Sequence, residues 1–229
     1  MNPKLLLFDI DGTLISARGI HKIAMGKVLA RRYSTFKYDS AYDFSGRTDP
    51  EIVENLLRYD NKEISDDLLN EILTEFCIEL KKEFLINKKP LIHIGVEKLI
   101  LELQANNTVF LGLVTGNIAE GARIKLESVG LYKYFPVGGF GDDSKNRNDL
   151  PPIARKRAEI HYNVNFAPAD IWIIGDSVHD IYCAQKNGLR CLAVSTGWTS
   201  REELAIADPE FLEDDLSDTK KIQEILLYR

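Results

Sequence analysis

Short apolar runs alternate with longer amphipathic segments along this 229-residue chain, and the alternation limits the folds open to it. The apolar runs are bounded by glycine, aspartate or threonine and cover residues 4–8, 109–114, 171–174 and 191–194. They are too short for buried helices and are typical of buried strands. Segments with helical spacing cover residues 95–105, 118–129, 153–162 and 181–187. Strands separated by helices predict an α/β fold, a doubly wound parallel sheet with helices on both faces.

Residues 16–89 break this alternation, because they carry helix signals and no convincing strand. Thr48 is followed by Pro50 and Glu51, a combination typical of a helix N-terminus. Ser65 begins a second helical pattern. We therefore predict an all-helical insertion of residues 16–89 in a main domain formed by residues 1–15 and 90–229. A short strand and a closing helix are expected after residue 210.

Composition excludes several classes of protein. The chain is 45% hydrophobic and 28% charged with a net charge of −6, and its lysines lie among glutamates. Nucleic-acid binders usually carry a basic face or tail, so no nucleic-acid partner is expected. No apolar run reaches the ~18 residues of a membrane span, and no signal peptide is recognised. Three widely spaced cysteines fit a reducing compartment. We expect a cytoplasmic protein without a membrane partner.

The sequence DIDGTL at residues 9–14 follows the first predicted strand directly. Burying Asp9 and Asp11 is costly unless a cation or hydrogen bonds compensate, and Gly12 permits a tight turn after them. One aspartate can act as a nucleophile while the other transfers a proton. An acidic loop that merely caps a helix is the alternative interpretation.

A second acidic sequence, GDSVHD at residues 175–180, follows another predicted strand. Asp176 and Asp180 would lie near each other over one helical turn. Because the ends of parallel strands open on the same edge of a sheet, Asp9, Asp11, Asp176 and Asp180 could converge on one cation. Oxygen-only ligands favour Mg²⁺. For this second sequence alone, an N-capped helix is the alternative.

The sequence VTGN at residues 114–117 ends a third predicted strand and opens a helix. The hydroxyl of Thr115, with the backbone at Gly116 and Asn117, would form an anion site at the helix N-terminus. Alternatively, Thr115 or Asn117 only caps the helix.

In wording, order and spacing, these motifs resemble those of the haloacid dehalogenase superfamily, on its phosphatase side. The resemblance extends over nearly the whole chain: DIDGTL resembles the first motif, Thr115 matches the second, and GDSVHD matches the fourth. The helical insertion lies where the superfamily's helical cap of the first type belongs. GRTD at residues 46–49 resembles a cap segment of the phosphoglycolate-phosphatase-like branch. The resemblance implies a Rossmann-like core with an inserted cap domain.

The resemblance also implies roles for individual residues. Asp9 would be the nucleophile and a metal ligand. Asp11 would be the general acid and base and would lend its backbone carbonyl to the metal. Thr115 would bind the transferring phosphoryl group. Asp176 would ligate Mg²⁺ directly, and Asp180 would support the metal directly or through water.

The third motif departs from the pattern, because Lys145 in the segment 142–149 lacks the proline that often follows the lysine of relatives. Counting back from Ala154 favours Lys145, whereas the wording around Arg147 resembles a subgroup with arginine in this role. We favour Arg147, although either cation could bridge the nucleophile and the phosphoryl oxygens. Both could also be exposed loop charges. In the cap, Arg47 either reaches the substrate or forms a salt bridge.

The sequence thus predicts a Mg²⁺-dependent phosphatase that hydrolyses a small phosphorylated metabolite through an aspartyl phosphate on Asp9. Asp11 argues against dehalogenation, which has no alkoxide leaving group to protonate. A sugar phosphomutase is an alternative, but it would need a base in the cap, where we identify none. A phosphoryl-accepting module without turnover and an inactive scaffold are further alternatives. The protein is expected to be a monomer or a small homo-oligomer.

Overall fold

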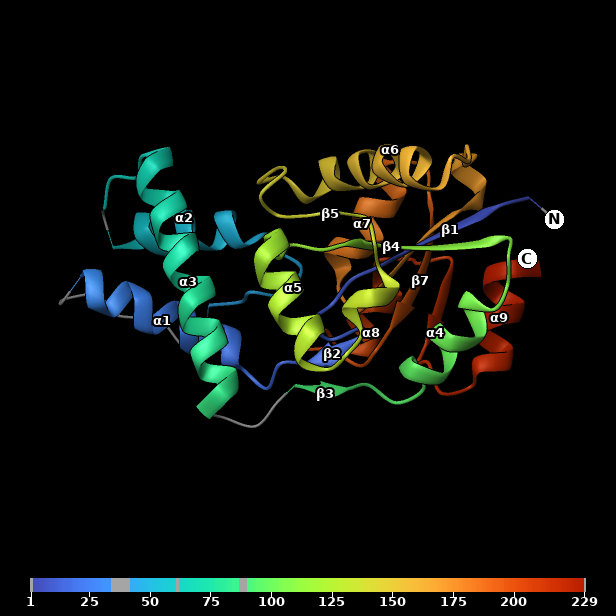
Figure 1. The fold of residues 1–229 in the computed structure, drawn as a ribbon, viewed down its shortest axis with the longest axis horizontal. Helices are drawn as coiled ribbons and strands as arrows, with labels where there is room; N and C mark the ends of the chain where they lie inside the picture. Colours follow the sequence, from blue (N-terminus) through green and yellow to red (C-terminus); the bar gives the residue numbers. More distant parts are fainter. Residues whose placement is uncertain (1, 34–41, 61, 87–89, 229) are drawn as a thin grey trace.

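A computed structural model describes residues 2–33, 42–60, 62–86 and 90–228 (Figure 1). Its main sheet has six strands in the order β5-β4-β1-β6-β7-β8, and all neighbouring pairs are parallel. The strands are β1 (Lys4–Phe8), β4 (Val109–Val114), β5 (Gly138–Gly139), β6 (Ile171–Gly175), β7 (Arg190–Val194) and β8 (Phe211–Glu213). The predicted doubly wound parallel sheet is confirmed, and the four predicted strands lie next to one another at its centre.

The alternating side chains of β1 build a core on each face of the sheet, because successive residues of a strand point to opposite faces. Leu6 and Phe8 belong to the cluster with α4 (Val96–Gln104), α5 (Ala119–Ser128) and α9 (Thr219–Tyr228). Leu5 and Leu7 belong to the opposite cluster, with α6 (Leu150–Tyr162), α7 (Val178–Lys186) and α8 (Arg201–Ile206). A strand buried on both faces reads as a continuous apolar run, as residues 4–8 do.

Three further helices form a separate body beside one end of the sheet (Figure 1): α1 (Ile20–Arg32), α2 (Asp49–Tyr59) and α3 (Asp66–Ile86). We call this body the cap. Thr48 caps α2 by accepting a hydrogen bond from the amide of Glu51 (3.3 Å), and Ser65 accepts one from the amide of Leu68 at the start of α3 (3.2 Å). The apolar faces of the three helices pack together and onto Ile118 and Ile124 of the α5 region.

Two-residue strands lie at the junctions between cap and sheet. β2 (Ile15–Ser16) pairs antiparallel with β3 (Leu91–Ile92). The prediction of no strand within residues 16–89 was therefore wrong at residue 16, and β5 was missed too, because two residues are too few to show a strand period. The proposed boundaries at 15/16 and 89/90 stay a prediction, and residues 87–89 lie outside the described part of the chain.

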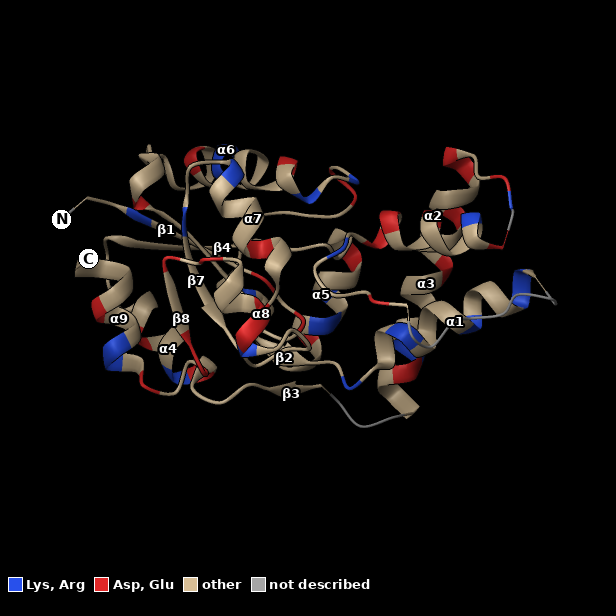
Figure 2. Ribbon diagram, turned by 180° about the vertical axis from the view of Figure 1, so that it is seen from behind, with Lys and Arg blue, Asp and Glu red and all other residues tan. Residues whose placement is uncertain are grey.

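Acidic and basic residues are interspersed over both bodies (Figure 2). Among the described residues, no helix has the length and hydropathy needed to cross a membrane. The three cysteines, Cys77, Cys183 and Cys191, are buried free thiols.

Candidate active site

Three neighbouring strands bring polar residues to one edge of the sheet. β1, β4 and β6 end immediately before Asp9, Thr115 and Asp176. The amide of Asp9 donates to the carbonyl of Ile174 on β6 (2.9 Å), which ties the end of β1 to its neighbour. The chain then turns at Gly12, whose φ of 91° favours glycine.

Three buried carboxylates meet at this edge. Asp9, Asp176 and Asp180 each have an oxygen within 4.8 Å of the others, and they are 6%, 4% and 0% exposed. Burial, reinforced by the charges of Asp180 and Asp11, raises the pKa of Asp9 to about 6 against the opposing effect of Arg147. Burial and the charges of Asp9 and Asp180 raise the pKa of Asp176 well above its usual range.

Asp180 reaches the cluster from the first turn of α7. Its Oδ2 accepts bonds from the amide and hydroxyl of Ser177 (3.2 and 2.6 Å), while the Ser177 hydroxyl accepts from the amide of Asp180 (3.3 Å). This capping box fixes the carboxylate, so that Oδ1 faces the guanidinium of Arg147.

The structure separates the two candidates of the third motif. Arg147 is buried, its Nη2 lies 3.1 Å from Oδ1 of Asp9 and also contacts Asp180, and its Nη1 donates to the Gly46 carbonyl of the cap (3.2 Å). The ammonium of Lys145 instead pairs with Glu54 of α2 (2.5 Å). Only Arg147 of the two lies in the carboxylate cluster.

Asp11 lies beside a different set of groups. Its Oδ2 accepts bonds from Nζ of Lys125 (2.5 Å) and Nδ2 of Asn117 (2.8 Å). Burial alone would raise the pKa of Asp11, but the charges of Lys125 and His21 and the two hydrogen bonds outweigh burial and lower it. The surroundings thus raise the pKa of Asp9 and lower the pKa of Asp11.

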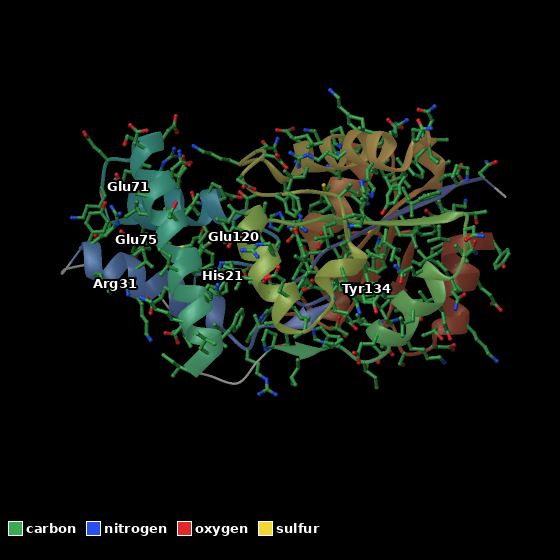
Figure 3. The ribbon with its side chains drawn as sticks, in the orientation of Figure 1. His21, Arg31, Glu71, Glu75, Glu120 and Tyr134 are labelled. Atoms are coloured by element: carbon green, nitrogen blue, oxygen red, sulfur yellow. The ribbon has the colours of Figure 1, made fainter. Side chains whose placement is uncertain are left out.

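Sequence reasoning missed Lys125 and His21. Lys125 shares the apolar face of α5 with Ile118 and Ala122, at helical spacings of seven and three, so its burial was open to prediction. His21 comes from the first turn of α1, and Figure 3 labels it between the cap helices and α5. A lone histidine gives no such signal, and only packing brings it to Lys125.

The Thr115–Asn117 segment is tied to the cap as well as to the acids. Thr115 Oγ1 accepts a bond from Nδ2 of Asn117 (2.8 Å), and the Gly116 carbonyl accepts one from the amide of Asp49 (2.7 Å). A Cβ on Gly116 would lie 1.9 Å from the carbonyl oxygen of Arg47, so glycine is required for this approach. Arg47 itself pairs with Glu51, the salt bridge considered as its alternative role.

The donor set fits a hard divalent cation. The three clustered carboxylates, Asp9, Asp176 and Asp180, offer only oxygen ligands. Gly12 and Gly197 leave space for the carboxylate of Asp176. A Cβ on Gly12 would lie 2.2 Å from its Oδ2, and a Cβ on Gly197 would lie 1.6 Å from it. Oxygen ligands on fixed elements suit Mg²⁺.

A cavity of about 550 Å³ opens over the acids between sheet and cap. The sheet side contributes Asp9, Asp11 and Arg147, and the cap side contributes, among others, Arg18, Lys22, Phe44 and Arg47. A space of this size exceeds a phosphate group and leaves room for the group that carries it.

Most of the chain is similar to known phosphatases and to one hydrolase family. Residues 6–194 match the family model described as haloacid dehalogenase-like hydrolase. Pyrophosphatase PpaX of Bacillus mycoides is 28% identical, over 95% of either chain. Phosphoglycolate phosphatase of Vibrio parahaemolyticus is 25% identical, over 96% of this chain and 95% of the relative. The crystal structure of CbbY from Rhodobacter sphaeroides in complex with phosphate has a TM-score of 0.77 at 19% identity, over 94% of this chain and 96% of that one, a likeness of fold.

Proposed function

This chain belongs to the haloacid dehalogenase-like hydrolases, and from that premise we propose that it is a Mg²⁺-dependent phosphatase of phosphoric monoesters with Asp9 as its nucleophile. One observation carries the proposal. Asp9 lies at the end of the central strand, 3.1 Å from the buried cation Arg147 and beside two further carboxylates, with the separately held Asp11 two residues away.

The proposed first step moves the phosphoryl group to the protein. An oxygen of Asp9 attacks phosphorus, the bond from phosphorus to the leaving oxygen breaks, and Asp11 donates a proton to that oxygen. Arg147, and the hydroxyl and amide at Thr115, would bind the equatorial oxygens on which charge develops. Gly116 and Asn117 would line this site, and Arg47 would face the leaving group from the cap.

The second step reverses the proton's direction. Asp11 takes a proton from water, the water oxygen attacks phosphorus, and the aspartyl phosphate breaks to release phosphate and restore Asp9. Mg²⁺, held by Asp9, Asp176 and the backbone carbonyl of Asp11 with Asp180 in support, would supply positive charge that keeps Asp9 ionised and offsets the phosphoryl oxygens. A phosphate dianion near Asp11 would raise the pKa of that carboxyl and so favour its acid form.

The cavity is compatible with a small phosphorylated metabolite. Relatives named for pyrophosphate and phosphoglycolate make these compounds the first members of a substrate panel. We expect Mg²⁺-dependent release of phosphate from at least one member and loss of activity with EDTA. Rapid quenching in acid should trap a phosphorylated form of the unchanged protein. Asp9→Asn should abolish both turnover and this phosphorylated form. Asp67→Asn, on the exposed first turn of α3, is the matched control. Turnover by Asp9→Asn would overturn the mechanism.

A phosphomutase is the second candidate, because an ionisable group of the cap, His21, lines the cavity, which the sequence did not reveal. Its Nδ1 lies 2.9 Å from Nζ of Lys125, and its Nε2 lies 3.1 Å from Oδ1 of Asp49. Incubation with a sugar monophosphate and a catalytic amount of its bisphosphate separates the two candidates. Isomerised sugar phosphate would favour the mutase, and free phosphate alone would favour the phosphatase.

A further inference from the structure

A buried lysine of the main domain takes no part in the proposed chemical steps. Lys125 lies on α5 and is 0% exposed. Burying an ammonium costs several kcal/mol unless its charge and its three N–H donors are compensated. A lysine retained at such a position therefore calls for acceptors fixed around it.

Three polar atoms surround the ammonium, and two of them are oxygens that accept its hydrogen bonds. They are Oδ2 of Asp11 (2.5 Å), Oδ1 of Asn117 (2.5 Å) and Nδ1 of His21 (2.9 Å). Asp11 and Asn117 belong to the sheet side, whereas His21, which Figure 3 labels, comes from α1 of the cap. The other ring nitrogen of His21, Nε2, lies 3.1 Å from Oδ1 of Asp49.

Asp49, which lies next to His21, also contacts the start of α5. Its Oδ2 accepts the amide of Ile118 at the N-terminus of α5 (2.9 Å), and the carboxylate is 1% exposed. The charged groups around the ammonium are therefore Asp11 from the sheet and, through His21, Asp49 from the cap. The set is complete only with the cap in contact with α5.

The arrangement fixes one oxygen of Asp11 and spares the other. Oδ2 accepts from both Lys125 and Asn117, whereas Oδ1 has no hydrogen-bond partner in the described part of the chain. Asp11 borders the cavity. Oδ1 is thus the oxygen left to exchange a proton with a substrate or a water.

We propose that Lys125 is a positioning residue that holds Asp11 for proton transfer, and that the cap completes this support through His21. The inference rests on the proposed phosphatase function. The competing view is that Lys125 only joins cap and core as a buried ion pair. A purely structural loss would lower all activities alike, whereas misplacing Asp11 should affect only reactions whose leaving group needs a proton.

The test uses the leaving group as its readout. With enzyme in excess, aspartyl-phosphate formation is followed by rapid quenching for p-nitrophenyl phosphate, whose anion leaves without a proton, and for an alkyl phosphate, whose alkoxide needs one. Lys125→Met should slow the alkyl substrate on the order of 10²-fold and p-nitrophenyl phosphate only a few-fold. Lys156→Met, on the exposed face of α6, should change neither rate.

A double-mutant cycle sharpens the test. If Lys125 acts through Asp11, Lys125→Met should add little in an Asp11→Asn background. Equal losses on both substrates, or full additivity with Asp11→Asn, would overturn the inference. If Lys125→Met does not fold, His21→Ala is tested in its place, and the rate loss on the alkyl phosphate is again compared with the loss on p-nitrophenyl phosphate. His21→Gln should retain more of the alkyl phosphate rate, because an amide can both accept and donate a hydrogen bond. A wild-type protein that forms no phosphoprotein would instead refute the proposed function.

Discussion

Replacing Arg147 with alanine tests the assignment of the third motif. The guanidinium touches Asp9 and Asp180 and donates to Gly46 of the cap, all from a buried position. Lys145, two residues earlier, is the matched comparison, because its ammonium pairs with Glu54 and is 46% exposed. We expect Arg147→Ala to lower kcat on the order of 10²–10³-fold and Lys145→Ala to change it less than about threefold.

Two effects contribute to the loss in Arg147→Ala, and their sizes differ. With a pKa of about 6, Asp9 is about 90% ionised at pH 7. If removing the guanidinium raised that pKa by about one unit, roughly half of Asp9 would remain ionised without metal, a twofold effect that bound Mg²⁺ would make smaller still. Losing a buried donor to the transferring phosphoryl group typically costs about 3–4 kcal/mol. The loss of transition-state binding therefore dominates.

The assay is steady-state kinetics with one good substrate at saturating Mg²⁺, supported by circular dichroism of each variant. The fall should appear in kcat more than in KM, because the developing charge is greatest in the transition state. Arg147→Lys should recover part of the activity, since one ammonium cannot reproduce the several contacts of the guanidinium. A crippled Lys145→Ala protein beside a nearly normal Arg147→Ala protein would refute the assignment.

Three further predictions concern the same site. Asp176→Asn should abolish Mg²⁺ binding by calorimetry while the fold survives, whereas Asp180→Asn should also lower thermal stability, because it disturbs the cap of α7; equal thermal losses would contradict this. In EDTA, the raised pKa of Asp9 means that the folded protein binds its proton more tightly than the unfolded chain, so stability falls as pH rises from about 4 to 6, by about 3 kcal/mol. Asp9→Asn should flatten this part of the stability profile, and an unchanged pH profile would count against the shift. Gly116→Ala should raise KM at least about tenfold, because its Cβ would meet the carbonyl of Arg47 at 1.9 Å and hold the cap away; unchanged kinetics would show that the contact is dispensable.

The fold was accessible from sequence because its signals are local. β1, β4, β6 and β7 appear as apolar runs, since both faces of a central parallel strand are buried. Two-residue strands such as β2 and β5 carry no readable period, and they were missed. The capping sequences at residues 48 and 65 marked α2 and α3 correctly, because a cap needs only neighbours along the chain.

The candidate site was accessible in part, for a related reason. Acids placed directly after parallel strands must share a sheet edge, so the sequence alone implied that Asp9 and Asp176 meet. Their environments depended on residues distant in the sequence. Lys125 is separated from Asp11 by 114 positions, and no local pattern encodes that contact.

Only the tertiary structure shows which of the two candidate cations of the third motif lies beside Asp9. Both lie in one loop, and the count along the chain and the resemblance pointed to different residues. Arg147 begins a 3-10 turn that ends at Asp149, and its side chain lies beside buried carboxylates, which offset the cost of burying its charge. Lys145 instead pairs with Glu54 of the cap. Sequence thus determined the strands and the acids at their ends, because covalent spacing and burial periods fix both. Contacts of Arg147 with Asp180 of α7 and of Lys145 with Glu54 of α2 determined which cation faces those acids, because that choice depends on elements far apart in the chain.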